Sequence, residues 1–92
     1  MAITVFVPTP LRKLTNGNSK IQLGAANIAE LIERAEAQYP GFRGRVLGED
    51  GEIKRFINVF VNGTDIRTLQ GKATSIKDGD EVSVIPAMAG GA

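Results

Sequence analysis

The sequence predicts one α+β domain, in which a single main helix packs on one face of a mixed sheet of about four or five strands. Short alternating runs predict the strands, and an amphipathic segment with a signal at each end predicts the helix. These segments occur in the order strand, strand, helix, strand, minor elements, strand. An early hairpin, a helix across one face and later strands beside the first strand together form an α+β roll.

Four segments alternate between apolar and polar residues, as half-buried strands do. They are residues 2–7, 20–23, 55–61 and 81–85, and Pro86 ends the last because it has no backbone N–H group. Their core-facing side chains are expected to be Ile3, Val5, Val7, Ile57, Val59, Val61, Val82 and Val84. The turn signals are Asn16-Gly17-Asn18, within a long loop over residues 11–19, Asn62-Gly63 and Asp78-Gly79-Asp80.

The main helix is predicted to begin after Asn27 and to end at Pro40-Gly41. Asn27 can cap the first turn, and Glu30 can return a hydrogen bond in the manner of a capping box. The apolar face at helical spacing comprises Ile28, Leu31, Ile32, Ala35 and Tyr39.

Two further segments carry weaker patterns. Residues 42–52 are expected to form a short turn of helix that drops back on the core and then a loop. Residues 64–72 are polar, and we expect a short strand or an irregular excursion there, with Ile66 and Leu69 as its anchors.

The composition excludes several classes of function. The chain has 92 residues, enough for one modest core, and its 11 basic and 10 acidic residues give a net charge of +1, too balanced for a nucleic-acid binder. It contains no cysteine and no histidine, so it lacks a thiolate nucleophile, the usual proton shuttle and the commonest metal ligands. We therefore expect neither an enzyme nor a metal site. Without a signal peptide or an apolar membrane span, we expect a cytoplasmic protein.

Polar and charged residues outside the core receive ordinary interpretations. Asp65, Asp78 and Asp80 lack the spacing of a calcium loop and are expected to form turns. Seven basic side chains are expected to be solvated charge, some of which could steer the chain toward acidic partners: Arg12, Lys13, Arg43, Arg45, Lys54, Arg55 and Arg67.

Three large apolar residues alternate away from the inward set. Phe6, Phe60 and Ile85 would lie together, with Met88, on the sheet face that the helix leaves open. Single exposed apolar residues are common, but several on one open face favour a partner-docking patch. We call these four residues the docking patch.

The residues after Pro86 differ in composition from the rest of the chain. We divide the chain into a folded domain, residues 1–86, and a flexible C-terminal tail, residues 87–92, which has no charge and ends in Gly90-Gly91-Ala92. Glycines have no Cβ atom, so this tail would be slender, and about 16 Å of extended chain could enter a narrow tunnel in a partner. A frayed terminus with no function is the alternative.

Several runs resemble one protein family. Residues 78–82, followed by Pro86 and then Gly90-Gly91, resemble the C-terminal signature of the MoaD/ThiS family of sulfur carriers, which have the ubiquitin-like β-grasp fold. Residues 55–62, 65–67, 71–74 and 86–91 resemble its CysO branch, the carriers of cysteine biosynthesis. The resemblance covers the last forty residues or so strongly, and the rest in outline.

The resemblance implies a carrier that binds no cofactor and catalyses nothing itself. An ATP-dependent adenylating enzyme of the ubiquitin-activating type would activate the Gly91 carboxylate, and sulfide or a sulfurtransferase would convert it to a thiocarboxylate, with Met88, Ala89 and Gly90 as the adjoining tail. The CysO branch further implies a pyridoxal-phosphate-dependent cysteine synthase as partner, and a metallopeptidase that trims the C-terminus. Carriers for molybdopterin, thiazole or homocysteine and methionine synthesis are alternatives, as is a ubiquitin-like modifier joined to lysines through Gly91.

The chain departs from this family at its last residue. The family ends in Gly-Gly, whereas Ala92 follows Gly91 here and makes it an internal amide that cannot be adenylated. Either a peptidase removes Ala92 at a processing site between Gly91 and Ala92, or Ala92 is an artificial addition that blocks the chemistry. We favour processing.

Overall fold

The computed structural model describes residues 2–86 and contains a five-stranded sheet in the order β2-β1-β5-β3-β4. The strands are β1 (Ile3–Phe6), β2 (Lys20–Leu23), β3 (Ile57–Val61), β4 (Thr64–Asp65) and β5 (Glu81–Pro86). β1 runs parallel to β5, whereas the other pairs are antiparallel, so the sheet is mixed as predicted. The last strand thus lies between the first strand and the third.

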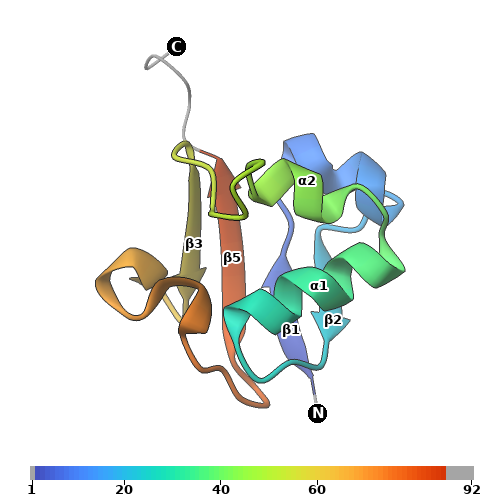
Figure 1. Ribbon diagram of the computed structural model, residues 1–92. Coiled ribbons are helices and arrows are strands. Elements are labelled where there is room, and N and C mark those ends of the chain that lie inside the picture. The colour runs from blue at the N-terminus through green and yellow to red at the C-terminus, as the bar shows by residue number, and fades with distance from the viewer. Residues whose placement is uncertain (1, 87–92) are drawn as a thin grey trace.

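Helix α1 (Ile28–Gln38) crosses one face of this sheet, and the shorter α2 (Phe42–Val46) follows on the same side (Figure 1). The Asn27 side chain accepts a hydrogen bond of 2.8 Å from the Glu30 N–H group, which confirms the predicted cap. Glu30 returns its bond to the N–H group of Ala26, one residue before the position expected for a capping box, at 2.6 Å. Two N–H groups at the start of α1, those of Ala26 and Glu30, therefore donate hydrogen bonds to side chains.

The core lies between α1, α2 and the covered face of the sheet. All of the strand residues predicted to face inward are buried, and so are four of the five predicted apolar residues of α1. Tyr39, the fifth, is partly buried against the same core. The additional core residues are Leu11, Ile21, Leu23, Phe42, Val46, Ile66 and Ile76. The period of each pattern was thus enough to identify which side of each element meets the core.

Two predictions about connecting segments are wrong. The expected loop over residues 11–19 is largely a 3-10 helix, η1 (Thr9–Thr15), because Pro10 suits its first turn and Leu11 reaches the core. Leu69 is not an anchor but is 46% exposed, since it lies at the end of the short helix η2 (Ile66–Thr68), where the chain turns away toward η3 (Gly71–Ala73). Ile66 does anchor this excursion, as predicted.

Strand β5 runs through Pro86, one residue further than predicted. Pro86 pairs with Ile57 of β3. The Asn62 N–H group donates to the Glu81 carbonyl at 2.8 Å, and hydrogen-bonded pairs alternate along an antiparallel ladder, so the Ile57–Pro86 pair is a non-hydrogen-bonded one. The missing N–H group of Pro86 therefore removes no hydrogen bond from the β3–β5 ladder. The proline can thus be the last residue of the strand.

The end of the sheet opposite Pro86 is held by a polar network. Asp80 is buried and accepts hydrogen bonds from the Asn62 side chain at 3.1 Å and from the Lys77 N–H group at 2.9 Å. Asn62 and Gly63 have φ values of 50° and 89°, as the predicted hairpin turn between β3 and β4 requires. Asp80 thus joins this turn to the start of β5.

In the described residues, no helix has the length and apolar character needed to cross a membrane.

Candidate functional site

The sheet face that lies opposite the helices carries the docking patch. The register pairs Phe6 of β1 with Ser83 of β5, and Ser83 with Phe60 of β3. The two phenylalanines therefore flank one small residue, on strands about 10 Å apart. Both rings are half-buried. A row of side chains, Phe6, Ser83 and Phe60, thus crosses the three central strands.

Ile85 adjoins this row, further along β5. It lies two residues beyond Ser83, so it shares that face, and 48% of it is exposed. Polar and charged residues on the same face surround the apolar ones: Thr4, Lys20, Asn58 and Glu81. Three members of the predicted docking patch are therefore brought together, with the polar rim that is typical of a protein interface. The fourth, Met88, lies outside the described residues.

The other predicted site residues also lie outside the described part of the chain. These are Ala89 and Gly90, the predicted adenylation site Gly91, and Ala92. The structure does place Pro86, after which they begin, at the end of β5 beside the start of β3. The last described residue, Pro86, therefore lies at the same end of the sheet as Ile85.

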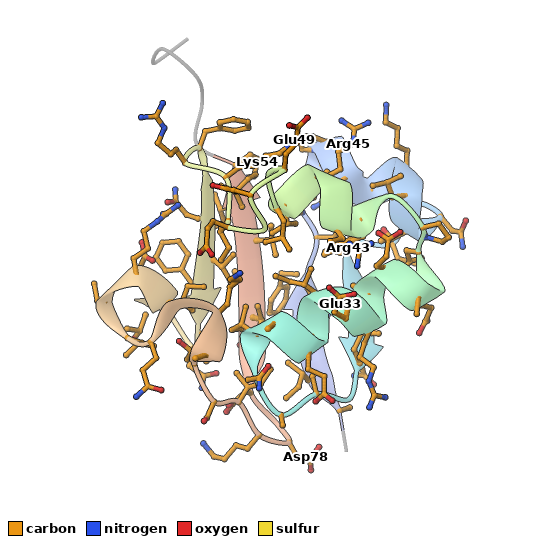
Figure 2. All side chains as sticks on the ribbon, in the orientation of Figure 1. Glu33, Arg43, Arg45, Glu49, Lys54 and Asp78 are labelled. Atoms are coloured by element: carbon orange, nitrogen blue, oxygen red, sulfur yellow. The ribbon has the colours of Figure 1, made fainter. Side chains whose placement is uncertain are left out.

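A tight turn before β3 lies next to this exit. We call residues 54–57 the exit turn; it is closed by a hydrogen bond of 3.0 Å from the Ile57 N–H group to the Lys54 carbonyl. The Lys54 ammonium lies 5.9 Å from the centre of the Phe56 ring, and that ring is 52% exposed. Figure 2 shows Lys54, Arg45 and Glu49 at this end of the molecule and Asp78 at the opposite end. Both signs of charge are thus present near the exit.

Arg67 is exposed, in keeping with its predicted role as solvated charge, but its guanidinium also binds the exit turn. Its Nη2 atom donates to the carbonyl oxygens of Ile57 at 2.7 Å, Lys54 at 3.2 Å and Arg55 at 3.5 Å. Its Nη1 atom donates to Oδ1 of Asn58 at 2.6 Å. No periodic pattern signals such contacts, because they join side chain to backbone across separate elements.

The helical side of the molecule has a hollow of about 560 Å³ between α1, α2 and the loop that follows. Its charges are largely paired within the molecule: Arg43 contacts Glu33 at 2.6 Å, and Lys72 contacts Glu52 at 3.3 Å. The described residues include no group of three or more acidic, cysteine or histidine side chains placed to hold a metal ion.

The sequence matches the model of the ThiS family over residues 5–91. The chain belongs to the ThiS family. The match includes Gly90 and Gly91 and covers the sheet except for Ile3 and Thr4 of β1. The family membership predicted from the C-terminal signature is confirmed.

Curated relatives within this group include carriers and modifiers. Sulfur carrier protein CysO of Mycobacterium tuberculosis is 39% identical over 93 residues, which cover 99% of this chain and 100% of the relative. Small archaeal modifier protein 3 of Haloferax volcanii is 46% identical over 66 residues, which cover 72% of this chain and 71% of the relative. The resemblance to CysO therefore extends over the full length of both chains.

Solved structures agree with this grouping. CysO in the Amycolatopsis orientalis BexX/CysO complex structure matches with a TM-score of 0.91 and 38% identity, over 97% of this chain and 99% of that one. CysO of Mycobacterium tuberculosis matches with a TM-score of 0.89 and 36% identity, over 94% and 99% of the two chains. The fold is the ubiquitin-like β-grasp, as predicted.

Proposed function

We propose that this ThiS-family chain is a sulfur carrier protein that works through the carboxylate of Gly91. The observation that supports this most directly is the full-length match to CysO, together with a family match that ends at Gly91. Ala92 lies beyond that match, in keeping with its removal before the protein acts. The carrier itself performs no catalysis.

The proposed chemistry has two steps. A carboxylate is a poor electrophile, so an oxygen of the Gly91 carboxylate first attacks the α-phosphorus of ATP, which forms an acyl adenylate and releases pyrophosphate. Sulfide, or a persulfide on a sulfurtransferase, then attacks the Gly91 carbonyl carbon and displaces AMP. Sulfide gives the thiocarboxylate directly, whereas a persulfide gives an acyl disulfide; a thiol reductant must then attack the sulfurtransferase sulfur of its S–S bond, which releases the thiocarboxylate and leaves the thiol in a disulfide with the sulfurtransferase. The product is a thiocarboxylate, and the adenylating enzyme supplies the catalytic groups for the first step.

Partners would bind the folded domain and so bring the reactive C-terminal end to their own active sites. Docking through Phe6, Phe60 and Ile85 would make the later transfer effectively intramolecular, which raises the effective concentration of the sulfur nucleophile. Beyond the adenylating enzyme, we propose a pyridoxal-phosphate-dependent cysteine synthase as the sulfur acceptor, and a metallopeptidase that trims the added cysteine. Both follow from the likeness to CysO.

The experiment combines the chain ending at Gly91 with ATP and the adenylating enzyme of the source organism. We expect pyrophosphate release and, after addition of sulfide, an intact mass that differs by one sulfur-for-oxygen exchange. The full chain ending at Ala92 is the matched control and should give neither product. Absence of pyrophosphate from the trimmed chain, while an established carrier succeeds with its own enzyme, would contradict the proposal. So would sulfur transfer by protein that retains Ala92.

A ubiquitin-like modifier is the second candidate, and the likeness to small archaeal modifier protein 3 favours it. Both functions use an activated Gly91, so activation alone does not separate them. An immunoblot of native cell extract does: a ladder of heavier adducts indicates a modifier, whereas free protein with one added sulfur indicates a carrier.

A further inference from the structure

Strand β3 is longer than its outer neighbour β4, so part of its edge has no strand partner. β4 pairs only with Phe60 and Val61. The Ile57 carbonyl points to this outer side, because the inner side of Ile57 faces Pro86 in a non-hydrogen-bonded pair. An edge carbonyl of this kind needs a donor from elsewhere or from water.

Arg67 provides that donor. It lies in η2, directly after β4, and its N–H group donates to Oδ1 of Asp65 at 2.8 Å, which fixes the start of η2. From there the guanidinium reaches three carbonyls of the exit turn and the Asn58 side chain. A planar guanidinium suits this arrangement because it presents several N–H groups in a fixed geometry.

The opposite side of the exit turn is also held. The Lys54 N–H group donates to the Val46 carbonyl at the end of α2, at 2.9 Å. The turn is thus fixed between α2 and Arg67, and it leads directly into Ile57, the residue that pairs with Pro86. If the exit turn became more mobile on the side that Arg67 binds, the Ile57–Pro86 pair would become more mobile as well.

We propose that Arg67 is a positioning residue, which fixes the position of Pro86, the last described residue before the predicted tail. It does so through the exit turn and the Ile57–Pro86 pair, and it does not touch the reacting carboxylate. The consequence for adenylation rests on the proposed function. A fixed Pro86 would start the predicted tail at a constant place relative to the docking patch, so fewer docked complexes would be unproductive.

The first test needs no partner and measures amide hydrogen exchange by NMR in the full chain. In R67Q we expect the amides of Ile57, Asn58 and Ile85 to exchange on the order of 10-fold faster, because local opening of this end becomes easier. The amides of β1 should be unchanged. R34Q is the matched control, since Arg34 is an exposed arginine on α1 whose partner Glu30 lies 3.6 Å away. Equal exchange in R67Q and wild type would overturn the proposal.

A second variant covers the case in which R67Q does not fold. N58A removes only the 2.6 Å contact between the guanidinium and Asn58, and it should speed exchange at Ile57 and Ile85 in the same direction but less. A folded N58A with wild-type exchange at both positions would overturn the proposal in that case.

The third test measures pyrophosphate release from the chains ending at Gly91. For R67Q we expect kcat to fall about 3- to 10-fold, with the KM for the carrier within about twofold, because the docking patch is intact. A rise in KM alone, or an unchanged kcat, would overturn the positioning role. If wild-type protein releases no pyrophosphate, the proposed function fails, and hydrogen exchange alone decides whether Arg67 fixes the exit.

Discussion

Among single residues, Asp80 shows how a charge is kept inside this small domain. The Asn62 side chain, and then the Lys77 N–H group, hold the pKa of the Asp80 carboxyl below its usual value. The folded pKa is thus lower than the unfolded one. The resulting stability is complete above the unfolded pKa and is lost as the pH falls through the folded pKa.

The D80N variant tests this network. Its free energy of unfolding at pH 7 should be lower than that of wild type by about 1–3 kcal/mol, the range for a buried hydrogen bond to a charged group. At about pH 3, below the unfolded pKa, the difference should be smaller than at pH 7, and it should vanish only below the lower folded pKa, where wild-type Asp80 loses its charge. Urea unfolding at both pH values measures this. D50N, at an exposed aspartate, is the control, and a difference that does not vary with pH would contradict the assignment.

At the scale of elements, α1 is held at its first turn by two side chains. Asn27 and Glu30 satisfy N–H groups that no helical carbonyl can reach. A second fixed point follows the helix, where the Glu36 carboxylate accepts bonds from the N–H groups of Gly41 and Arg43. The Arg43 bond, and then that of Gly41, lower the pKa of Glu36. The helix is therefore tied to its neighbours at both ends by local side chains.

Replacement of Asn27 by alanine tests the cap. We expect the free energy of unfolding to fall by about 1 kcal/mol, since alanine cannot accept the bond from the Glu30 N–H group. Chemical denaturation measures the change. N18A replaces an exposed asparagine in the turn before β2 and should be nearly neutral. An equal loss in both variants would show that the cap is not the cause.

At the scale of the whole molecule, the two faces of the sheet differ in what covers them. Helices cover one face (Figure 1) and complete the core, whereas Phe6, Phe60 and Ile85 lie on the other face within a polar rim. The exit of the tail and the exposed end of this patch lie at the same end of β5. A partner that holds the open face would therefore also receive the tail.

The F60D variant tests the open face. We expect it to fold, because the ring lies on the side away from the core, and to bind the adenylating enzyme about 10- to 100-fold more weakly, as loss of an apolar anchor does. Calorimetry or surface-immobilised binding measures the affinity. A37D, on the exposed side of α1, is the matched control. Equal affinity of F60D and wild type would dispose of the docking patch.

Much of this architecture was predictable because the signals for strands, helix starts and turns depend on residues that are close together in the sequence. The period-2 alternation in β1, β3 and β5 identified their buried sides, and Asn27 and Asn62-Gly63 identified a helix start and a hairpin turn. The docking patch followed from the same alternation, which assigns Phe6, Phe60 and Ile85 to one face as soon as the strands are paired. Boundaries were less predictable, as Pro86 and η1 illustrate.

The sequence by itself determined which side of each strand and helix is buried, and that two adjacent glycines precede the last residue, Ala92, because hydrophobic period and residue type are local properties of the chain. Only the tertiary structure decided that β5 lies between β1 and β3, that Leu69 is exposed, and that Arg67 binds the exit turn. Asp80 and Asn62 are 18 residues apart, and Arg67 and Ile57 are 10 apart. Such partners meet only when separate elements pack together, and no repeat along the chain encodes the distance between them.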